Sequence, residues 1–291
     1  MLLTIATYGK NDNYAGNFVQ RLEFNLCKLV ENIDRLGIQD DVEIIVTDWG
    51  STERLSDFCK VPKRDYLKFL YVPQETCNRY VPDSKFSIPH ALNAAARRMN
   101  GDNLLCIDSD TYISFEGFSG IYNLLKNNKQ DYVYYWASRY HIPYNVQSRM
   151  RNIQEMDLML DEWIELGKPL VNRSELADGF FHDEINLDDF LGCACALLLD
   201  KRLVFESSLL YEKLTKWGWM DIEISQRFRR YNYLPLGDLE SVLNSNFYHI
   251  GHHEITTGNH VNGSNNNYQP TALFANSDDW GMVNEILELK N

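Results

Sequence analysis

Two carboxylates that directly follow an apolar run are the residues best suited to chemistry. Asp108-Ser109-Asp110 follows the run Asn103 to Ile107, which has the pattern of a buried parallel strand. Ligands of open α/β sheets bind at the carboxyl ends of the strands, and alternate residues of an extended chain point the same way. Both Asp side chains are therefore predicted to face one cation or one nucleotide. A solvated turn is the alternative for an isolated Asp-x-Asp string.

Two further stretches place acidic residues where an α/β fold exposes them. An apolar run from Glu43 ends in Asp48-Trp49-Gly50-Ser51, which is again a strand followed by a tight turn. Trp217-Gly218-Trp219-Met220-Asp221-Ile222-Glu223 opens a helix with acidic residues in its first turn. Tyr248 to His253 then supplies three histidines.

In this order the motifs resemble those of glycosyltransferases with the GT-A fold, nearest to family 2 and the β-1,4-galactosyltransferase-like group. The resemblance covers approximately Leu3 to His253 and rests on the combination of motifs. It implies an α/β fold with a Rossmann-like, mainly parallel sheet flanked by helices, and an insertion that shapes the acceptor site. It also implies a metal-dependent transferase that moves a sugar from a UDP-linked donor to a glycan hydroxyl, with inversion favoured.

The resemblance gives the donor end of the site to the early strands. Asp48 would accept the uracil imide N–H, with Thr7 and Tyr8 beside the same base, although Trp49 stands where family 2 often has a second Asp. Asp110 would bind the metal, Asp108 the ribose or a metal-bound water, and Ser109 lies between them. The alternative for Asp48 is a carboxylate that caps a turn.

The implied cofactor is Mn²⁺ or Mg²⁺. His249 lies about as far after Trp217 as the metal-binding His does in the galactosyltransferase-like group, and imidazole is compatible with Mn²⁺. The three histidines and two Asp also allow a zinc site, but their spacing fits no helix-borne zinc motif.

Asp221 is implied as the catalytic base. Inversion needs a carboxylate to take the proton of the attacking hydroxyl, and Asp221 lies four residues after Trp217, where the related motif Trp-Gly-Gly-Glu-Asp has its base. Met220 replaces the Glu of that motif, and Glu223 is a second candidate. The alternative is an ordinary acidic helix start.

Further donor contacts are expected on a helix from about Lys85 to Met99. Asn93 and Arg97 share one face of it and are placed to approach ribose or phosphate, whereas Arg98 is expected to face solvent. Gly192, at the start of an apolar run, and Trp217, as part of a sugar-stacking wall or of the core, complete the expected donor site.

The pattern of elements supports a parallel sheet. A helix with inward residues Phe18 to Ile33 ends at Gly37, and strands and helices alternate through Lys126, with a further strand at Tyr132 to Ser138. We predict one domain over 1–291. Residues 1–138 form its nucleotide-sugar half, 139–253 its acceptor and catalytic half, and 254–291 a C-terminal loop with a short helix near Met282 to Leu289.

Composition excludes several classes of partner. The 291 residues carry a net charge of −13, which argues against a nucleic acid or an anionic membrane surface. No run is long enough to span a membrane. The six cysteines form no Cys-x-x-Cys pair, and a reducing, cytoplasmic setting is expected.

Three other functions stay open. A retaining transferase would use Asp221 only to hold the acceptor. A sugar-nucleotide nucleotidyltransferase would carry a Gly- and Arg-rich phosphate loop near the first strand, which the chain lacks there. An inactive carbohydrate-binding protein would not need the base, metal and nucleotide candidates together.

Overall fold

A central sheet organises the part of the chain that the structure describes. The computed structural model describes residues 1–137, 140–142, 171–172, 196–215, 218, 220–245, 247–250 and 271–291. The eight strands of the sheet lie in the order β10-β6-β9-β4-β1-β2-β3-β12. Their bounds are β1 Leu3–Gly9, β2 Val42–Trp49, β3 Leu67–Val72, β4 Asn103–Ile107, β6 Tyr134–Ala137, β9 Ala196–Asp200, β10 Gly237–Asp238 and β12 Glu288–Lys290.

The sheet is mainly parallel, as the alternation of strands and helices predicted. β1 pairs in parallel with β2 and β4, β2 with β3, and β6 with β10. β9 is antiparallel to both β4 and β6, and β12 is antiparallel to β3. A second sheet, β5-β11-β7-β8, comprises Thr111–Ile113, Phe247–Ile250, Tyr140–Ile142 and Val171–Asn172.

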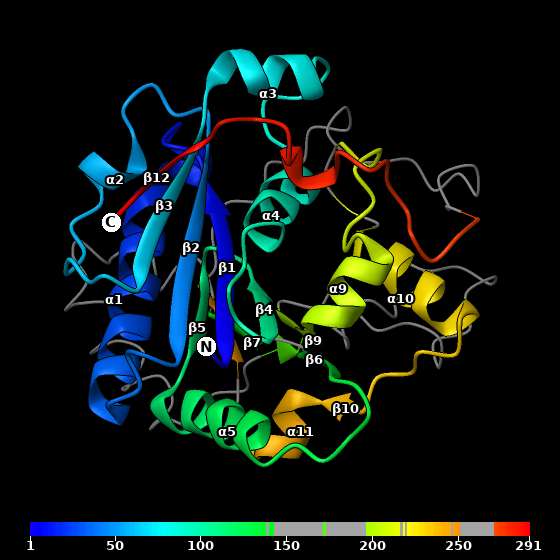
Figure 1. The fold of residues 1–291 in the computed structure, drawn as a ribbon. Coiled ribbons are helices and arrows are strands. Elements are labelled where there is room, and N and C mark those ends of the chain that lie inside the picture. Colours follow the sequence, from blue (N-terminus) through cyan, green and yellow to red (C-terminus); the bar gives the residue numbers. More distant parts are fainter. Residues whose placement is uncertain are drawn as a thin grey trace.

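Helices cover both faces of the central sheet (Figure 1). One face packs against α1 and α5, and the other against α4, α9 and α10. Alternate residues of β1 show the division, since Ile5 joins the first core cluster and Ala6 the second. The helices are α1 Phe18–Leu36, α2 Leu55–Phe58, α3 Gln74–Tyr80, α4 Ile88–Ala96, α5 Phe115–Lys126, α9 Lys201–Ser207, α10 Met220–Arg230 and α11 Leu239–Leu243, with 3-10 turns η1 Tyr14–Gly16 and η4 Trp280–Met282.

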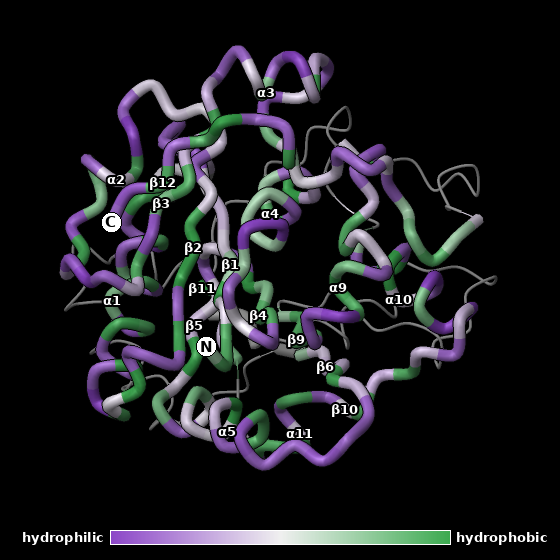
Figure 2. Tube along the Cα trace, in the orientation of Figure 1, coloured by the Kyte–Doolittle hydropathy of each residue, from purple (hydrophilic) through white to green (hydrophobic). Residues whose placement is uncertain are grey.

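The local sequence signals for α1 are confirmed. Its predicted inward residues, from Phe18 to Ile33, are buried, and Gly37 ends the helix at φ +67°, where its N–H donates to the carbonyls of Ile33 and Asp34. Figure 2 shows the same division of polarity over the fold, with β4 largely hydrophobic and with hydrophobic and hydrophilic stretches alternating along α10.

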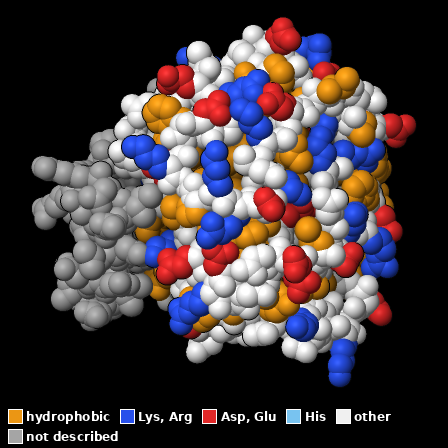
Figure 3. All heavy atoms as spheres, turned by 60° about the vertical axis from the view of Figure 1, so that its left-hand side comes forward, with side chains coloured by type: hydrophobic (Ala, Val, Ile, Leu, Met, Phe, Trp, Pro, Cys, Tyr) orange, Lys and Arg blue, Asp and Glu red, His pale blue; other side chains and the backbone are white. Residues whose placement is uncertain are grey.

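The C-terminal segment differs from expectation. A short helix was predicted near Met282 to Leu289, but the chain instead forms η4 and then strand β12, which extends the sheet beside β3. An edge strand can pair through its backbone whatever its side chains are, so its helix-like apolar spacing was misleading. On this side of the molecule basic and acidic side chains are interspersed (Figure 3), with ion pairs such as Arg54–Glu288.

Two further observations bear on the expected setting. Within the described ranges no helix has the length and apolar character that crossing a membrane requires. Cys27, Cys59, Cys77 and Cys106 are free thiols. The cytoplasmic setting stays a prediction. Most of the expected acceptor insertion lies outside the described residues, so the internal division of the domain also stays a prediction.

Candidate functional site

The carboxyl ends of three parallel strands meet at one edge of the sheet. β1 is flanked by β2 and β4, and Gly9 at its end is in register with Asp48 of β2. The turn after β4 begins at Asp108. The residues predicted from the strand ends are therefore brought to one edge, which is where open α/β sheets bind ligands.

The Asp108–Asp110 turn is fixed from both sides. The Tyr8 hydroxyl donates to Asp108 Oδ1 at 2.7 Å, so the end of β1 orients the first carboxylate. The Asn25 side-chain amide on α1 donates to the Ser109 carbonyl at 2.6 Å. Ser109 is 6% exposed and Asp110 7%. The turn is thus a buried, held structure, unlike the solvated turn that was the alternative reading of this motif.

Asp110 lies between an imidazole and a guanidinium. His249 Nε2 is 3.3 Å from Asp110 Oδ1, and Arg21 Nε is 3.4 Å from Oδ2. β11 delivers His249 because it pairs antiparallel with β5, and the Ile250 N–H donates to the Asp110 carbonyl at 2.9 Å. The structure therefore brings His249 beside Asp110, two of the three residues predicted at the metal with Asp108, although they lie far apart in the sequence.

The Asp110 carboxylate and the His249 imidazole together suit a hard divalent cation whose other ligands come from substrate and water. Neighbouring ligands of an octahedral ion with bonds of about 2.1 Å lie about 3 Å apart, close to the Asp110–His249 separation. Among the described residues, no group of three or more His, Cys, Asp and Glu is close enough to hold a metal alone. Mg²⁺ and Mn²⁺ commonly complete their shells with substrate phosphates and water, so two protein ligands suit them.

Helix α1 contributes two site residues that the sequence reasoning missed. Arg21 and Asn25 are 0% and 3% exposed and point from α1 toward the Asp108–Asp110 turn. They lie four residues apart, among the buried apolar positions of the helix. Polar residues at inward helical positions were the signal available, because such residues are buried only when something pairs with them.

Thr7 and Tyr8 lie at the end of β1, as predicted. Thr7 is 1% exposed, and its hydroxyl has no hydrogen-bond partner in the described part of the chain. Tyr8 is 7% exposed, and its ring packs 5.6 Å from that of Phe86. Their expected position beside a nucleotide base stays a prediction, and Tyr8 has the additional task of holding Asp108.

Asp48 is held by two backbone donors. Its carboxylate is 1% exposed, and its two oxygens accept the backbone N–H groups of Ser51 at 3.1 Å and Leu55 at 2.8 Å. Burial raises the pKa of Asp48 above its usual range. The carboxylate therefore caps the turn after β2 and the start of α2, as the alternative for this residue predicted, and its expected contact with a uracil base stays a prediction.

Asn93 and Arg97 both contact other segments of the chain. Asn93 is fully buried, and its side chain donates to Leu210 and Glu212 on the opposite segment. Arg97 stacks over the ring of Trp280 at 4.9 Å. Asn93 thus holds the segment after α9, and Arg97 contacts the C-terminal segment, while their expected approach to ribose or phosphate stays a prediction.

Arg98 was expected in solvent, yet it is partly buried against the same segment. Its guanidinium donates to the carbonyls of Gly281, Met282 and Glu285. The C-terminal segment packs over α4, and a pattern within the helix alone does not show that a distant segment covers Arg98.

The two candidate bases occupy different environments on α10. Asp221 is half-buried in the first turn and accepts the N–H of Ile222 at 3.1 Å. Glu223 is 5% exposed, and both its oxygens accept from Arg227, at 2.6 and 3.2 Å. A carboxylate that is buried and paired on both oxygens is poorly placed to take a substrate proton, so the geometry favours Asp221.

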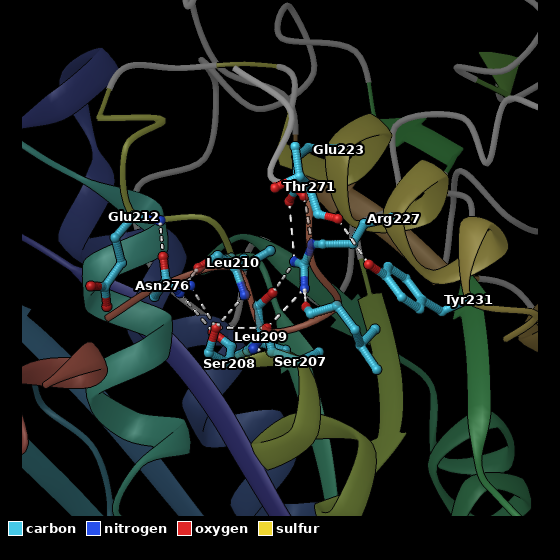
Figure 4. A network of polar contacts seen from close by, with 12 residues as sticks. Ser207, Ser208, Leu209, Leu210, Glu212, Glu223, Arg227, Tyr231, Thr271 and Asn276 are labelled. Atoms are coloured by element: carbon cyan, nitrogen blue, oxygen red, sulfur yellow. Dashed lines mark hydrogen bonds and ion pairs between the residues drawn. The ribbon is translucent and has the colours of Figure 1, made fainter. Parts of the chain in front are cut away.

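Arg227 ties α10 to two other segments (Figure 4). Its guanidinium is buried and donates to the carbonyls of Ser207 at 2.8 Å, Leu273 at 2.7 Å and Leu209. The helix that carries Asp221 is thereby fixed to the turn after α9 and to the C-terminal segment. The acidic start of this helix was predicted from the sequence, but the role of Arg227 in fixing it was not.

Some predicted residues fall outside the described ranges. These are Gly192, Trp217 and Trp219, together with the second and third histidines, His252 and His253. Their expected roles stay predictions.

Comparison with known proteins decides the family. The model for glycosyl transferase family 2 matches residues 20–185, which is more than half of the chain and includes the Asp108–Asp110 turn. The chain belongs to glycosyl transferase family 2. The resemblance read from its motifs is thereby confirmed, and with it the class of enzyme. No curated protein matched the chain.

Solved structures share the fold of this family 2 chain at low identity. GalNAc-T7 with UDP, GalNAc and Mn²⁺ is 12% identical, with 87% of this chain and 44% of that chain covered at a TM-score of 0.50. S. aureus TarS 1–349 is 14% identical, with 87% and 59% covered at a TM-score of 0.45. The catalytic domain of Drosophila β1,4-galactosyltransferase 7 with xylobiose is 11% identical, with 91% and 76% covered at 0.46.

The predicted GT-A architecture is confirmed by this likeness. A mainly parallel eight-stranded sheet flanked by helices matches the fold of glycosyltransferases. The chain spans 59% of TarS 1–349 and 36% of the longer TarS chain.

Proposed function

We propose that this family 2 member transfers a sugar from a UDP-linked donor to a hydroxyl of a glycan acceptor, with a divalent cation and with inversion. The observation that carries the proposal is the Asp110–His249 pair, 3.3 Å apart at the carboxyl edge of the sheet. GalNAc-T7, which shares the fold, was solved with UDP and Mn²⁺ and supports the choice of ligand.

The metal would be held by Asp110 and His249. Mn²⁺ or Mg²⁺ bound there would neutralise charge on the diphosphate leaving group. Asp108, oriented by Tyr8, lies beside it and would hold the ribose or a metal-bound water. Asp48 would act on the nucleotide indirectly, through the turn that it caps.

Asp221 would act as general base. In the transfer, the acceptor oxygen bonds to the anomeric carbon as the bond from that carbon to the diphosphate oxygen breaks. The acceptor proton passes to Asp221, and the electron pair of the broken bond leaves with UDP. Attack from the face opposite the diphosphate inverts the anomeric configuration.

A screen of nucleotide sugars tests the proposal. Thermal stabilisation and Mn²⁺-dependent hydrolysis are measured for a panel of UDP-, GDP- and CDP-sugars, with and without excess chelator. We expect one UDP-sugar to stabilise the protein and to be turned over only with metal. Turnover that survives the chelator would reject the metal role.

Single variants then distinguish a loss of metal binding from a loss of folding. Asp110→Asn and His249→Ala should each weaken Mn²⁺-dependent UDP binding in a calorimetric titration while the protein stays folded. Glu116→Gln, which removes an exposed carboxylate from the first turn of α5, serves as control and should bind UDP as wild type does. Analysis of the product by NMR distinguishes inversion from retention.

A further inference from the structure

Arg21 places a permanent positive charge beside the predicted metal ligand. Its guanidinium Nε lies 3.4 Å from Asp110 Oδ2, on the other side of the carboxylate from His249. Arg stays protonated at every physiological pH. The negative charge of Asp110, which is expected to attract the cation, is thus already balanced by the positive charge of Arg21.

The guanidinium is held so that it cannot swing away. Arg21 is 0% exposed, donates to the side-chain oxygen of Asn17, and donates to the Tyr14 carbonyl at 3.4 Å. Phe18 packs 5.9 Å from it. The contacts anchor it in the loop after β1 and in the first turns of α1, and therefore it stays beside Asp110 when a second cation arrives.

We infer that Arg21 weakens the binding of metal alone and so makes metal binding depend on the diphosphate of the donor. Near the cation, Arg21 offsets the charge of Asp110, a ligating His249 is neutral, and Asp108, held by Tyr8, is the remaining carboxylate of the predicted site. Two positive charges a few ångströms apart at a buried site repel strongly, because little water screens them. A diphosphate brings the negative charge and oxygen ligands that the protein withholds, so donor and metal bind together.

This inference rests on the proposed function and assigns Arg21 as a positioning residue for its metal. Arg21 is not expected to touch the UDP-sugar itself, because its side chain is buried. It predicts reciprocity: UDP should raise the affinity for Mn²⁺ by the same factor as Mn²⁺ raises the affinity for UDP.

The test measures Mn²⁺ binding directly, by the loss of the free-ion EPR signal, with and without UDP. We expect wild type to bind Mn²⁺ at least 100-fold more weakly without UDP than with it. Arg21→Met removes the charge and keeps much of the volume, and it should bind Mn²⁺ alone at least tenfold more tightly. Arg21→Lys keeps the charge and should resemble wild type.

The outcomes separate the inference from the proposed function. Wild type that binds Mn²⁺ equally well with and without UDP would overturn the inference even if Arg21→Met did not fold. A folded Arg21→Met with no gain in affinity for Mn²⁺ alone would also overturn it, and the proposed function would stand. Wild type that binds Mn²⁺ in neither condition would overturn both.

Discussion

The paired changes Asp221→Asn and Glu223→Gln distinguish a catalytic carboxylate from a structural one on the same helix. Asp221 is half-buried, whereas Glu223 is 5% exposed and gives both oxygens to Arg227. Each change replaces a carboxylate by an amide of nearly equal shape. Asp221→Asn is expected to lower kcat, and Glu223→Gln is expected to lower the stability of the fold.

For Glu223→Gln the expected loss is one of stability. Removing one partner of a buried ion pair costs about 3–5 kcal/mol, and we expect about 3 kcal/mol because the amide oxygen still accepts one N–H. For a chain of this size that free energy lowers the melting temperature by roughly 6–12 °C, at roughly 2–4 °C per kcal/mol. Arg227 also loses its charge partner while bound to three carbonyls (Figure 4).

For Asp221→Asn the expected loss is one of rate. A positioned general base contributes about 10²–10⁴-fold, so kcat should fall by that factor while the melting temperature and UDP affinity stay near those of wild type. Calorimetry gives the melting temperatures, and initial rates are measured at least about 12 °C below the melting temperature of the less stable variant, a margin equal to the largest expected shift.

The control is Glu116→Gln, the same change at an exposed helix start, which should alter the free energy of unfolding by less than about 0.5 kcal/mol. A Glu223→Gln variant that melts as wild type does but loses kcat by 100-fold or more would show that Glu223 is catalytic and not structural. Near-normal turnover in Asp221→Asn would equally remove Asp221 as the base.

Three further predictions concern stability. Burial lowers the pKa of His90 to about 4, so this residue should remove roughly 3 kcal/mol of stability as pH falls from about 6.5 toward 4, a loss absent from His90→Gln in melts across that range. Gly281→Ala should cost about 1–3 kcal/mol, because Gly281 has φ +63° and a Cβ would lie 2.5 Å from the Asn93 carbonyl oxygen. Gly37→Ala, at φ +67° in open space, is its control in urea melts and should cost less. Asp48→Ala should cost about 1–3 kcal/mol, because two backbone N–H groups lose their acceptor, and urea melts showing no loss would contradict the capping role.

Local patterns predicted the elements that carry the site. The apolar run before Asp108, the inward face of α1 and its end at Gly37 were all readable, because strand burial, helical periodicity and a glycine cap are local properties. The order of the motifs was also sufficient for the family and the GT-A fold.

Contacts between distant segments could not be predicted from local sequence patterns. Asp48 fitted a nucleotide-binding motif and Glu223 a catalytic one, yet the first caps a turn and the second pairs with Arg227. Asn93 and Arg97 lie on the same helix, but Asn93 bonds to Glu212 after α9 and Arg97 contacts Trp280 in the C-terminal segment. A motif specifies which residue type stands at a position, whereas burial and partners depend on which chain packs over it.

Periodicity and the alternation of elements were enough to predict a mainly parallel sheet and the strand end at which Asp108 and Asp110 lie. The surroundings of Asp110 followed from packing between distant elements. The pairing of β11 with β5 brings His249 to one of its oxygens, and the packing of α1 brings Arg21 to the other. The physical reason is that both contacts join elements far apart in the chain, and no local pattern records the charge that a distant element will bury beside a carboxylate.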